Sequence, residues 1–283
     1  MSQESPRRVA LVTGGTDGIG KATAQRLLSG GWEVVITGRS SAKCDATVAE
    51  LRKSANGASV SAIVADLSSM AAVAQAAVQF RQTANRLDLL LLNANSITQE
   101  HTLTSDQFES NFAVGYLGRV LLAWALEDLL RKTPSSQVLS VVGLNLLRLD
   151  FDDPSSARGF SSMKALGRWQ WAMQVFAREW NRRSPVAMNI YMPGLVKTKI
   201  LANEPQPMRL FVQIANVIMG VPVLRAGEEL YTVIEDIRTH NRRDSYYART
   251  QPKPPRALKE QPGDGEKLWA LTERLLAPFR QPS

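Results

Sequence analysis

Three of the four glycines in the run 13–20 form the part of the sequence whose spacing most directly suggests chemistry. Gly14, Gly18 and Gly20 follow an apolar run at 9–13 and open a stretch with helical character. This order predicts a tight turn at the first glycine, a close backbone approach at the second and close helix–sheet packing at the third. The free N–H groups at the start of the helix would attract phosphate groups. The segment therefore predicts a site for the pyrophosphate of a dinucleotide.

The chain around this loop alternates short β-branched runs with longer helical patterns. The predicted strands lie at 9–13, 33–37, 60–65, 87–93, 137–142 and 186–191. The predicted helices lie at 18–29, 42–53, 70–83, 106–132, 161–182 and 266–276. Strands alternating with helices predict a single-domain α/β fold of the Rossmann type, a doubly wound parallel sheet of about seven strands flanked by helices.

Several motifs resemble the short-chain dehydrogenase/reductase family. The run 13–20 is similar to its Thr-Gly-x-x-x-Gly-x-Gly fingerprint, and 193–198 to its Pro-Gly-x-Val-x-Thr turn. Asn93-Ala94-Asn95 is similar to Asn-Ala-Gly, with Asn95 replacing the glycine, and 106–109 resembles the retinol-dehydrogenase-like branch. The resemblance implies cofactor contacts from Gly14, Thr16, Asp17, Gly18, Ile19, Gly20, Arg39, Asp66, Leu67, Asn93, Ala94, Lys164, Pro193, Gly194, Val196 and Thr198.

The end of the second predicted strand indicates which dinucleotide is bound. A carboxylate there commonly holds the ribose hydroxyls of NAD. This chain has Gly38 followed by Arg39, and a guanidinium can hold a 2′-phosphate through two parallel hydrogen bonds. Asp17 argues against NADP, because some NADP-preferring relatives carry a basic residue in the glycine loop. We expect the cofactor to be NADP(H).

The resemblance also implies four catalytic positions, three of which are replaced. The family uses tyrosine as the general acid or base, lysine to lower its pKa, serine to bind the carbonyl oxygen and asparagine to organise water. When Tyr-x-x-x-Lys is aligned on 160–164, Phe160 replaces the tyrosine and Lys164 remains. The serine falls on Gly143 and the asparagine on Gly115. Ordinary carbonyl reduction should then be slow, because a general acid contributes about 10²–10⁴ in rate.

Two residues are candidate substitutes for the missing groups. Asn145, two residues after the position of the serine, could donate to a substrate oxygen. His101 lies in the loop after the predicted strand 87–93, on the substrate side of such folds. Each is also readily explained as an ordinary loop residue.

Composition excludes several other classes of protein. The net charge is +8, but the basic residues are dispersed and do not interleave with aromatics, which argues against nucleic-acid binding. One cysteine and two histidines argue against a disulfide or a metal centre. The N-terminus has no apolar secretory segment, and the longest apolar run, 210–224, is too short and polar for a transmembrane helix. We expect a cytoplasmic protein.

The resemblance divides the chain at residue 250. Residues 1–250 form the predicted Rossmann domain, and 251–283 a C-terminal extension packed on it. The Rossmann part includes a lid at 199–225, whose apolar residues suggest an apolar small-molecule substrate or a surface that touches a membrane. The tryptophan-rich helix 161–182, together with 106–132, predicts a homodimer or homotetramer.

The sequence is compatible with three functions. The first is an NADP(H)-dependent reductase or cyclase that needs no tyrosine, acting for example on an iminium or a conjugated alkene. The second is a catalytically silent, cofactor-binding sensor or partner protein. The third is a retinol- or steroid-like dehydrogenase with displaced catalytic groups.

Overall fold

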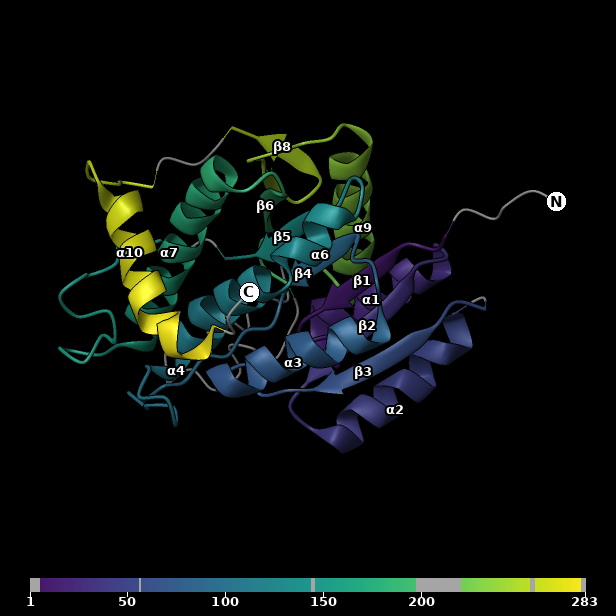
Figure 1. Ribbon diagram of the computed structural model, residues 1–283, viewed down its shortest axis with the longest axis horizontal. Coiled ribbons are helices and arrows are strands. Elements are labelled where there is room, and N and C mark those ends of the chain that lie inside the picture. The colour runs from purple at the N-terminus through teal and green to yellow at the C-terminus, as the bar shows by residue number, and fades with distance from the viewer. Residues whose placement is uncertain (1–5, 56, 144–145, 197–219, 255–257, 281–283) are drawn as a thin grey trace.

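One eight-stranded sheet organises the chain in the computed structural model, which describes residues 6–55, 57–143, 146–196, 220–254 and 258–280 (Figure 1). The strand order is β3-β2-β1-β4-β5-β6-β7-β8, and all neighbours are parallel except the antiparallel pair β7 and β8. The strands are β1 Val9–Val12, β2 Glu33–Gly38, β3 Val60–Val64, β4 Leu89–Leu92, β5 Gln137–Val141, β6 Ala187–Met192, β7 Tyr246–Ala248 and β8 Gln251–Lys253.

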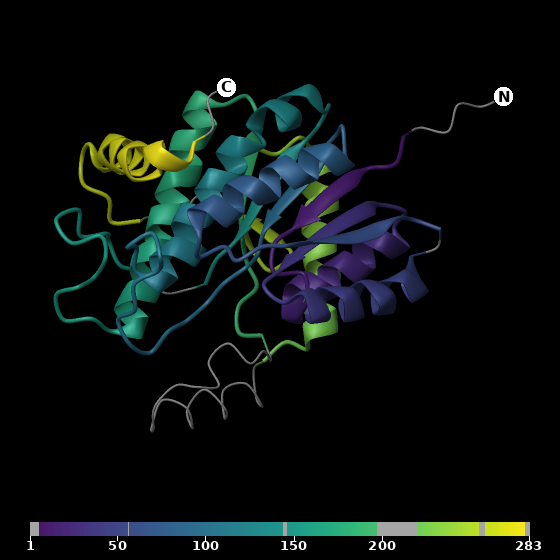
Figure 2. The same ribbon diagram turned by 60° about the horizontal axis from the view of Figure 1, so that its bottom comes forward.

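Helices cover both faces of this sheet. Two apolar clusters lie on opposite faces, and Figures 1 and 2 show the two helical layers. One layer consists of α1 Gly18–Ser29, α2 Ser41–Leu51 and α9 Val223–Thr239. The other consists of α3 Met70–Thr83, α4 Ser110–Phe112, α5 Gly118–Ala125, α6 Glu127–Lys132, α7 Ser162–Arg183 and α10 Asp264–Leu276. The predicted Rossmann-type fold is confirmed, with β7 and β8 added at the edge.

The predicted helix 106–132 differs from the structure. Glu109 has an extended backbone, and its carboxylate accepts hydrogen bonds from the amides of Asn111 and Phe112, so the helix begins only at Ser110. A π-helical segment, Ala113–Leu117, follows. Further along, the backbone of Leu126 departs from helical geometry and separates α5 from α6. π-Helical turns are frequent at functional sites, and this one contains Gly115.

The tryptophans of α7 lie in the core of the chain. Trp169, Trp171 and Trp180 are fully buried. The C-terminal helix α10 packs against α7, where Trp269 stacks on Phe176 with ring centroids 5.2 Å apart. These three tryptophans therefore cannot form a subunit interface, and the expected homo-oligomer stays a prediction without their support. Across the described ranges, no helix has both the length and the apolar character needed to cross a bilayer.

An ion pair with a buried carboxylate connects α10 to the loop that precedes α7. Asp264 has a side chain that is 0% exposed, and it accepts hydrogen bonds from Arg148 Nε at 2.7 Å and Nη2 at 2.6 Å. The hydrogen bonds from Arg148 lower the pKa of the Asp264 carboxyl. The pair thus links the C-terminal segment to the Rossmann part.

We expect Arg148→Met to lower the free energy of unfolding by about 2–3 kcal/mol, because it leaves a buried carboxylate unpaired while the arginine is itself partly exposed. Since the folded-state pKa of Asp264 lies below its unfolded value, the difference is present above about pH 4 and shrinks as the pH falls further. Urea unfolding at several pH values measures it. Arg158→Met, which removes an arginine 70% exposed, is the control with an expected effect near zero.

Candidate dinucleotide and substrate site

A large cavity opens at the carboxyl ends of β1, β2, β4 and β5. Its volume is about 840 Å³. This edge of a doubly wound sheet, where the strand order reverses between β1 and β4, is the usual place for a bound dinucleotide. The cavity continues past β5 to α7 and to the segment that follows β6. Its size suits a dinucleotide or a substrate of comparable size.

The glycine loop forms the floor at the β1 end of the cavity. Gly14 has a φ of +65°, and a Cβ on Gly20 would lie 2.4 Å from the carbonyl oxygen of Gly14. Asn93, which directly follows β4, stabilises the glycine loop, because its Nδ2 donates a hydrogen bond to the carbonyl oxygen of Thr13 at 3.0 Å. Asp17 caps α1 by accepting from the amide of Gly18 at 2.7 Å. The loop is therefore shaped for a close approach of phosphate to the backbone at the start of α1.

The end of β2 carries two exposed cations and no carboxylate. A Cβ on Gly38 would lie 2.6 Å from Thr16 Cγ2 and 2.9 Å from Cys44 Sγ, so a carboxylate-bearing side chain does not fit there. Arg39, Ser40 and Lys43 line the adjoining part of the cavity, where α2 begins. Lys43 was not anticipated from the sequence, although its position one turn after Arg39 would have indicated it.

Most of the residues implied as cofactor contacts lie together around the cavity. Those that line it are Gly14, Thr16, Asp17, Gly18, Ile19, Arg39, Asp66, Leu67, Asn93, Ala94, Pro193, Gly194 and Val196. Gly20 packs beneath the loop rather than on the cavity surface. Thr198 and most of the predicted lid at 199–225 lie outside the described residues.

The structure does not bring Lys164 or Phe160 to the cavity. Lys164 is exposed and is absent from the cavity wall, and Phe160 precedes the start of α7, where its ring contacts His101. The two residues therefore do not share the helix face that a tyrosine and a lysine four residues apart would share. The cavity wall is built instead from other α7 residues, namely Met163, Leu166, Trp169 and Gln170. The expected role of Lys164 at the cofactor is therefore not supported by its position in the described part of the chain.

Of the two candidate substitutes, His101 does not line the described cavity. It forms a hydrogen bond of 3.0 Å through Nε2 with the carbonyl oxygen of Ser155. This contact joins two loops, which is a structural role. Asn145 lies outside the described residues.

The two glycines predicted to replace the catalytic serine and asparagine are tightly packed by α7. Gly143 lines the cavity, and a Cβ on it would lie 3.0 Å from both Nε2 and Oε1 of Gln170. A Cβ on Gly115 would lie 2.4 Å from Cδ2 of the Trp169 indole. An asparagine at 115 is therefore excluded by the tryptophan, and Gln170 occupies the space beside the serine position.

Arg119 is a cavity residue that the sequence analysis missed. It is 1% exposed and belongs to α5. Its Nη1 donates to Ser140 Oγ at 3.0 Å and to the carbonyl oxygen of Val141 at 2.7 Å, and its Nη2 to that of Ala94 at 2.7 Å. Burial lowers the pKa of Arg119 to about 9, so the guanidinium remains charged at neutral pH. The sequence feature that could have indicated Arg119 is the presence of one arginine within the otherwise apolar run 117–123.

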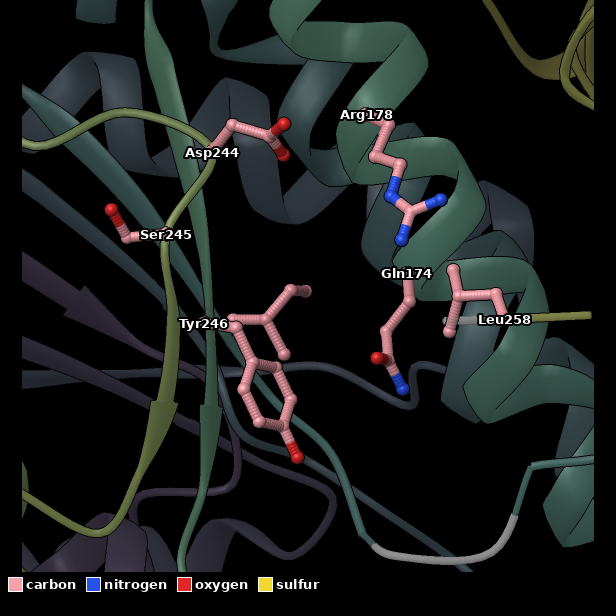
Figure 3. A pocket seen from close by; sticks show the side chains of 7 residues that line it. Gln174, Arg178, Asp244, Ser245, Tyr246 and Leu258 are labelled. Carbon is pink, nitrogen blue, oxygen red and sulfur yellow. The ribbon is translucent and has the colours of Figure 1, made fainter. Parts of the chain in front are cut away.

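A second pocket between α7 and the β6–β7 edge is too small for a substrate. Figure 3 shows the side chains around it, including Gln174, Arg178, Asp244 and Tyr246. Its volume of about 20 Å³ is enough for about one water molecule. The large cavity is therefore the candidate site.

The fold and the glycine loop define a Rossmann-type α/β protein, and comparison with known proteins identifies its family. The short chain dehydrogenase family model matches residues 8–209. The chain belongs to the short-chain dehydrogenase/reductase family, and its curated relatives place it with the retinol-dehydrogenase-like branch.

Three relatives show the extent of the similarity. Human retinol dehydrogenase 13 is 30% identical over 201 residues, which cover 69% of this chain and 61% of that protein. Human polyprenol dehydrogenase is 32% identical over 206 residues, which cover 69% and 62%. Mouse retinol dehydrogenase 13 is 26% identical over 282 residues, which cover 96% and 84%. The matched region thus spans about three fifths of the length of the two human relatives.

Solved structures share the fold at low sequence identity. The alcohol dehydrogenase from the archaeon Thermococcus sibiricus, complexed with 5-hydroxy-NADP, has a TM-score of 0.66 at 20% identity and covers 89% of this chain and 100% of its own. A blue fluorescent protein from a metagenomic library, in complex with NADPH, has a TM-score of 0.64 at 20% identity and covers 84% and 94%.

Proposed function

We propose that the protein is an NADP(H)-dependent reductase of non-standard mechanism that acts on an apolar small molecule without a tyrosine proton donor. The observation that carries this proposal is a dinucleotide cavity whose wall at β5 and α7 contains Gly143, Leu166 and Gln170, with no tyrosine or lysine among the described residues there. The described cofactor end carries the glycine loop, Arg39 and Lys43, whereas the described wall at β5 and α7 carries neither a tyrosine hydroxyl nor a lysine amine.

The residues of the cavity fit NADP(H) on two observations. Side chains do not fit at Gly14 and Gly20 of the glycine loop, so the backbone amides and the N-terminus of α1 would hold the pyrophosphate. The packing around Gly38 excludes a carboxylate, while Arg39 and Lys43 supply positive charge for a 2′-phosphate. When bound, NADPH supplies a hydride.

Leu166 and Gln170 take the positions of the tyrosine and the lysine. Residues four apart share one face of a helix, and Leu166 and Gln170 are the residues of α7 with this spacing among those that line the cavity. Gln170 packs against Gly143, the serine position. The proposal therefore moves the tyrosine–lysine register six residues along α7 from 160–164.

The substrate that we propose follows from the absence of a tyrosine or lysine among the described residues of the wall at β5 and α7. An acceptor that is already electron-poor, such as an iminium or a conjugated alkene, needs no proton from the protein at the atom that is attacked. The cavity residues then only bind, orient and shield the substrate, and water supplies the proton that an alkene also requires. The apolar side chains of Val114, Val142 and Leu166 suit a largely apolar molecule.

A substrate panel followed by NADPH absorbance tests the proposal. We expect simple ketones, aldehydes and retinoids to be reduced at least about 10²–10⁴ times more slowly than at least one conjugated or iminium acceptor, because a general acid contributes that factor. Rapid reduction of simple carbonyls would contradict the proposal and favour displaced catalytic groups. NADPH binding without turnover of any acceptor would contradict it in favour of a cofactor-binding protein.

A further inference from the structure

An unpaired positive charge is buried in the wall of the cavity, at Arg119. The three hydrogen bonds that it forms with described residues go to neutral oxygens, from Ser140, Val141 and Ala94. Buried charges in proteins are ordinarily paired with an opposite charge. Burial is the cause that lowers the pKa of Arg119, with no carboxylate among the described residues to oppose it.

The guanidinium keeps hydrogen atoms that the described residues do not use. A guanidinium has five N–H donors, and those of Nη1 are both engaged. Nη2 makes one hydrogen bond, and Nε is buried without a partner in the described part of the chain. Nε and Nη2 are neighbouring nitrogens, which together can hold the two oxygens of one carboxylate.

Two further polar atoms beside the same cavity are also unsatisfied. Trp169 Nε1 and Gln170 Oε1 are buried and have no partner among the described residues. Both residues line the cavity with Arg119, and the Trp169 ring centroid lies 4.9 Å from the guanidinium carbon. Buried polar groups without partners are rare in folded proteins, and several around one cavity indicate a polar ligand group that the described residues do not supply.

We propose that Arg119 and Trp169 form a binding site for the carboxylate of the otherwise apolar substrate. Arg119 supplies the charge, and the indole N–H of Trp169 is a further unused donor on a ring that lies beside the guanidinium. Val114, Val142 and Met163 provide an apolar wall for the rest of the molecule. The inference rests on the proposed function and narrows its substrate class. A fixed positive charge disfavours an iminium and favours a conjugated acid as the acceptor.

The test compares decanoate with decan-1-ol, which share a chain and differ in charge. Dissociation constants are measured calorimetrically at pH 7.5, with and without NADPH. We expect the parent to bind decanoate at least about tenfold more tightly than the alcohol, as a charge-assisted pair would. Arg119→Met should remove this preference, Arg119→Lys should keep part of it, and Arg238→Met, on the exposed side of α9, should leave it unchanged.

A second variant keeps the test decisive if Arg119→Met does not fold. Gln170→Glu is nearly isosteric and adds a negative charge to the same cavity, so it should also abolish the preference for decanoate. Equal affinity of the parent for the acid and the alcohol would overturn the proposal. So would an equal loss of NADPH and decanoate affinity in Arg119→Met, because the partner of Arg119 would then be a phosphate of the cofactor. Since turnover is not measured, failure of the reductase assignment would be seen separately in the substrate panel.

Discussion

The triple variant Gly143→Ser, Leu166→Tyr, Gln170→Lys should reduce simple ketones with NADPH at least about 10²–10⁴ times faster than the parent. The tyrosine would supply a proton donor, which the described wall at β5 and α7 lacks. The lysine, one turn further along α7, would lower the pKa of the tyrosine through its charge. Steady-state kinetics on a ketone panel measures the gain.

The packing of α7 decides how this variant is built. A Cβ on Gly143 lies at the limit of contact with the amide of Gln170, so serine is introduced together with a lysine whose end group can move away. The asparagine position, Gly115, is left unchanged because the Trp169 indole fills its side-chain space. Any increase in the rate of ketone reduction should therefore come from the introduced tyrosine, serine and lysine.

Phe160→Tyr is the matched control, because it creates Tyr-x-x-x-Lys with the existing Lys164. We expect no gain from it, since Phe160 and Lys164 lie outside the wall of the described cavity. A gain from Phe160→Tyr with none from the triple variant would show that the tyrosine–lysine register is 160–164 after all. NADPH binding by each variant confirms that the cofactor site is intact.

The cofactor end of the site could be predicted from the sequence because its determinants are local. The glycine loop lies within eight consecutive residues between β1 and α1, and Arg39 directly follows β2. Local turns and strand ends impose their geometry on neighbouring residues. The sequence positions therefore translate almost directly into positions on the cavity, as they do for Gly14, Gly18 and Asn93.

The substrate end could not be predicted in the same way, because it depends on the rotation and starting point of α7. The loop before that helix has no pattern that fixes its length, and Phe160-Ser161-Ser162-Met163-Lys164 offers a lysine that matches the family motif. The observed face has Met163, Leu166 and Gln170 at helical spacing, a pattern that is visible in the sequence but has no chemical signature. Only the packing of α7 against Gly143 and Gly115 selects between the two registers.

The parent should bind NADPH more tightly than NADH, and Arg39→Ala should reduce this preference by about tenfold or more. A hydrogen bond to a charged group contributes about 1.5–3 kcal/mol, and 1.4 kcal/mol corresponds to a factor of ten in affinity. The packing at Gly38 excludes a carboxylate side chain at the end of β2, the usual position for binding the ribose hydroxyls of NADH. Fluorescence titration with each cofactor gives the ratio of dissociation constants.

Lys43 and Arg39 should contribute unequally to this ratio. Arg39 can hold a phosphate through two parallel hydrogen bonds, whereas Lys43 is a single charge on a flexible stem, so Lys43→Ala should have the smaller effect. Lys53→Ala, an exposed residue outside the cavity wall, is the control and should leave both affinities unchanged. The affinity for NADH should be similar in all three variants, because NADH carries no 2′-phosphate. Equal affinities of the parent for the two cofactors would show that Arg39 and Lys43 do not read the 2′-phosphate, and the assignment to NADP(H) would then be wrong.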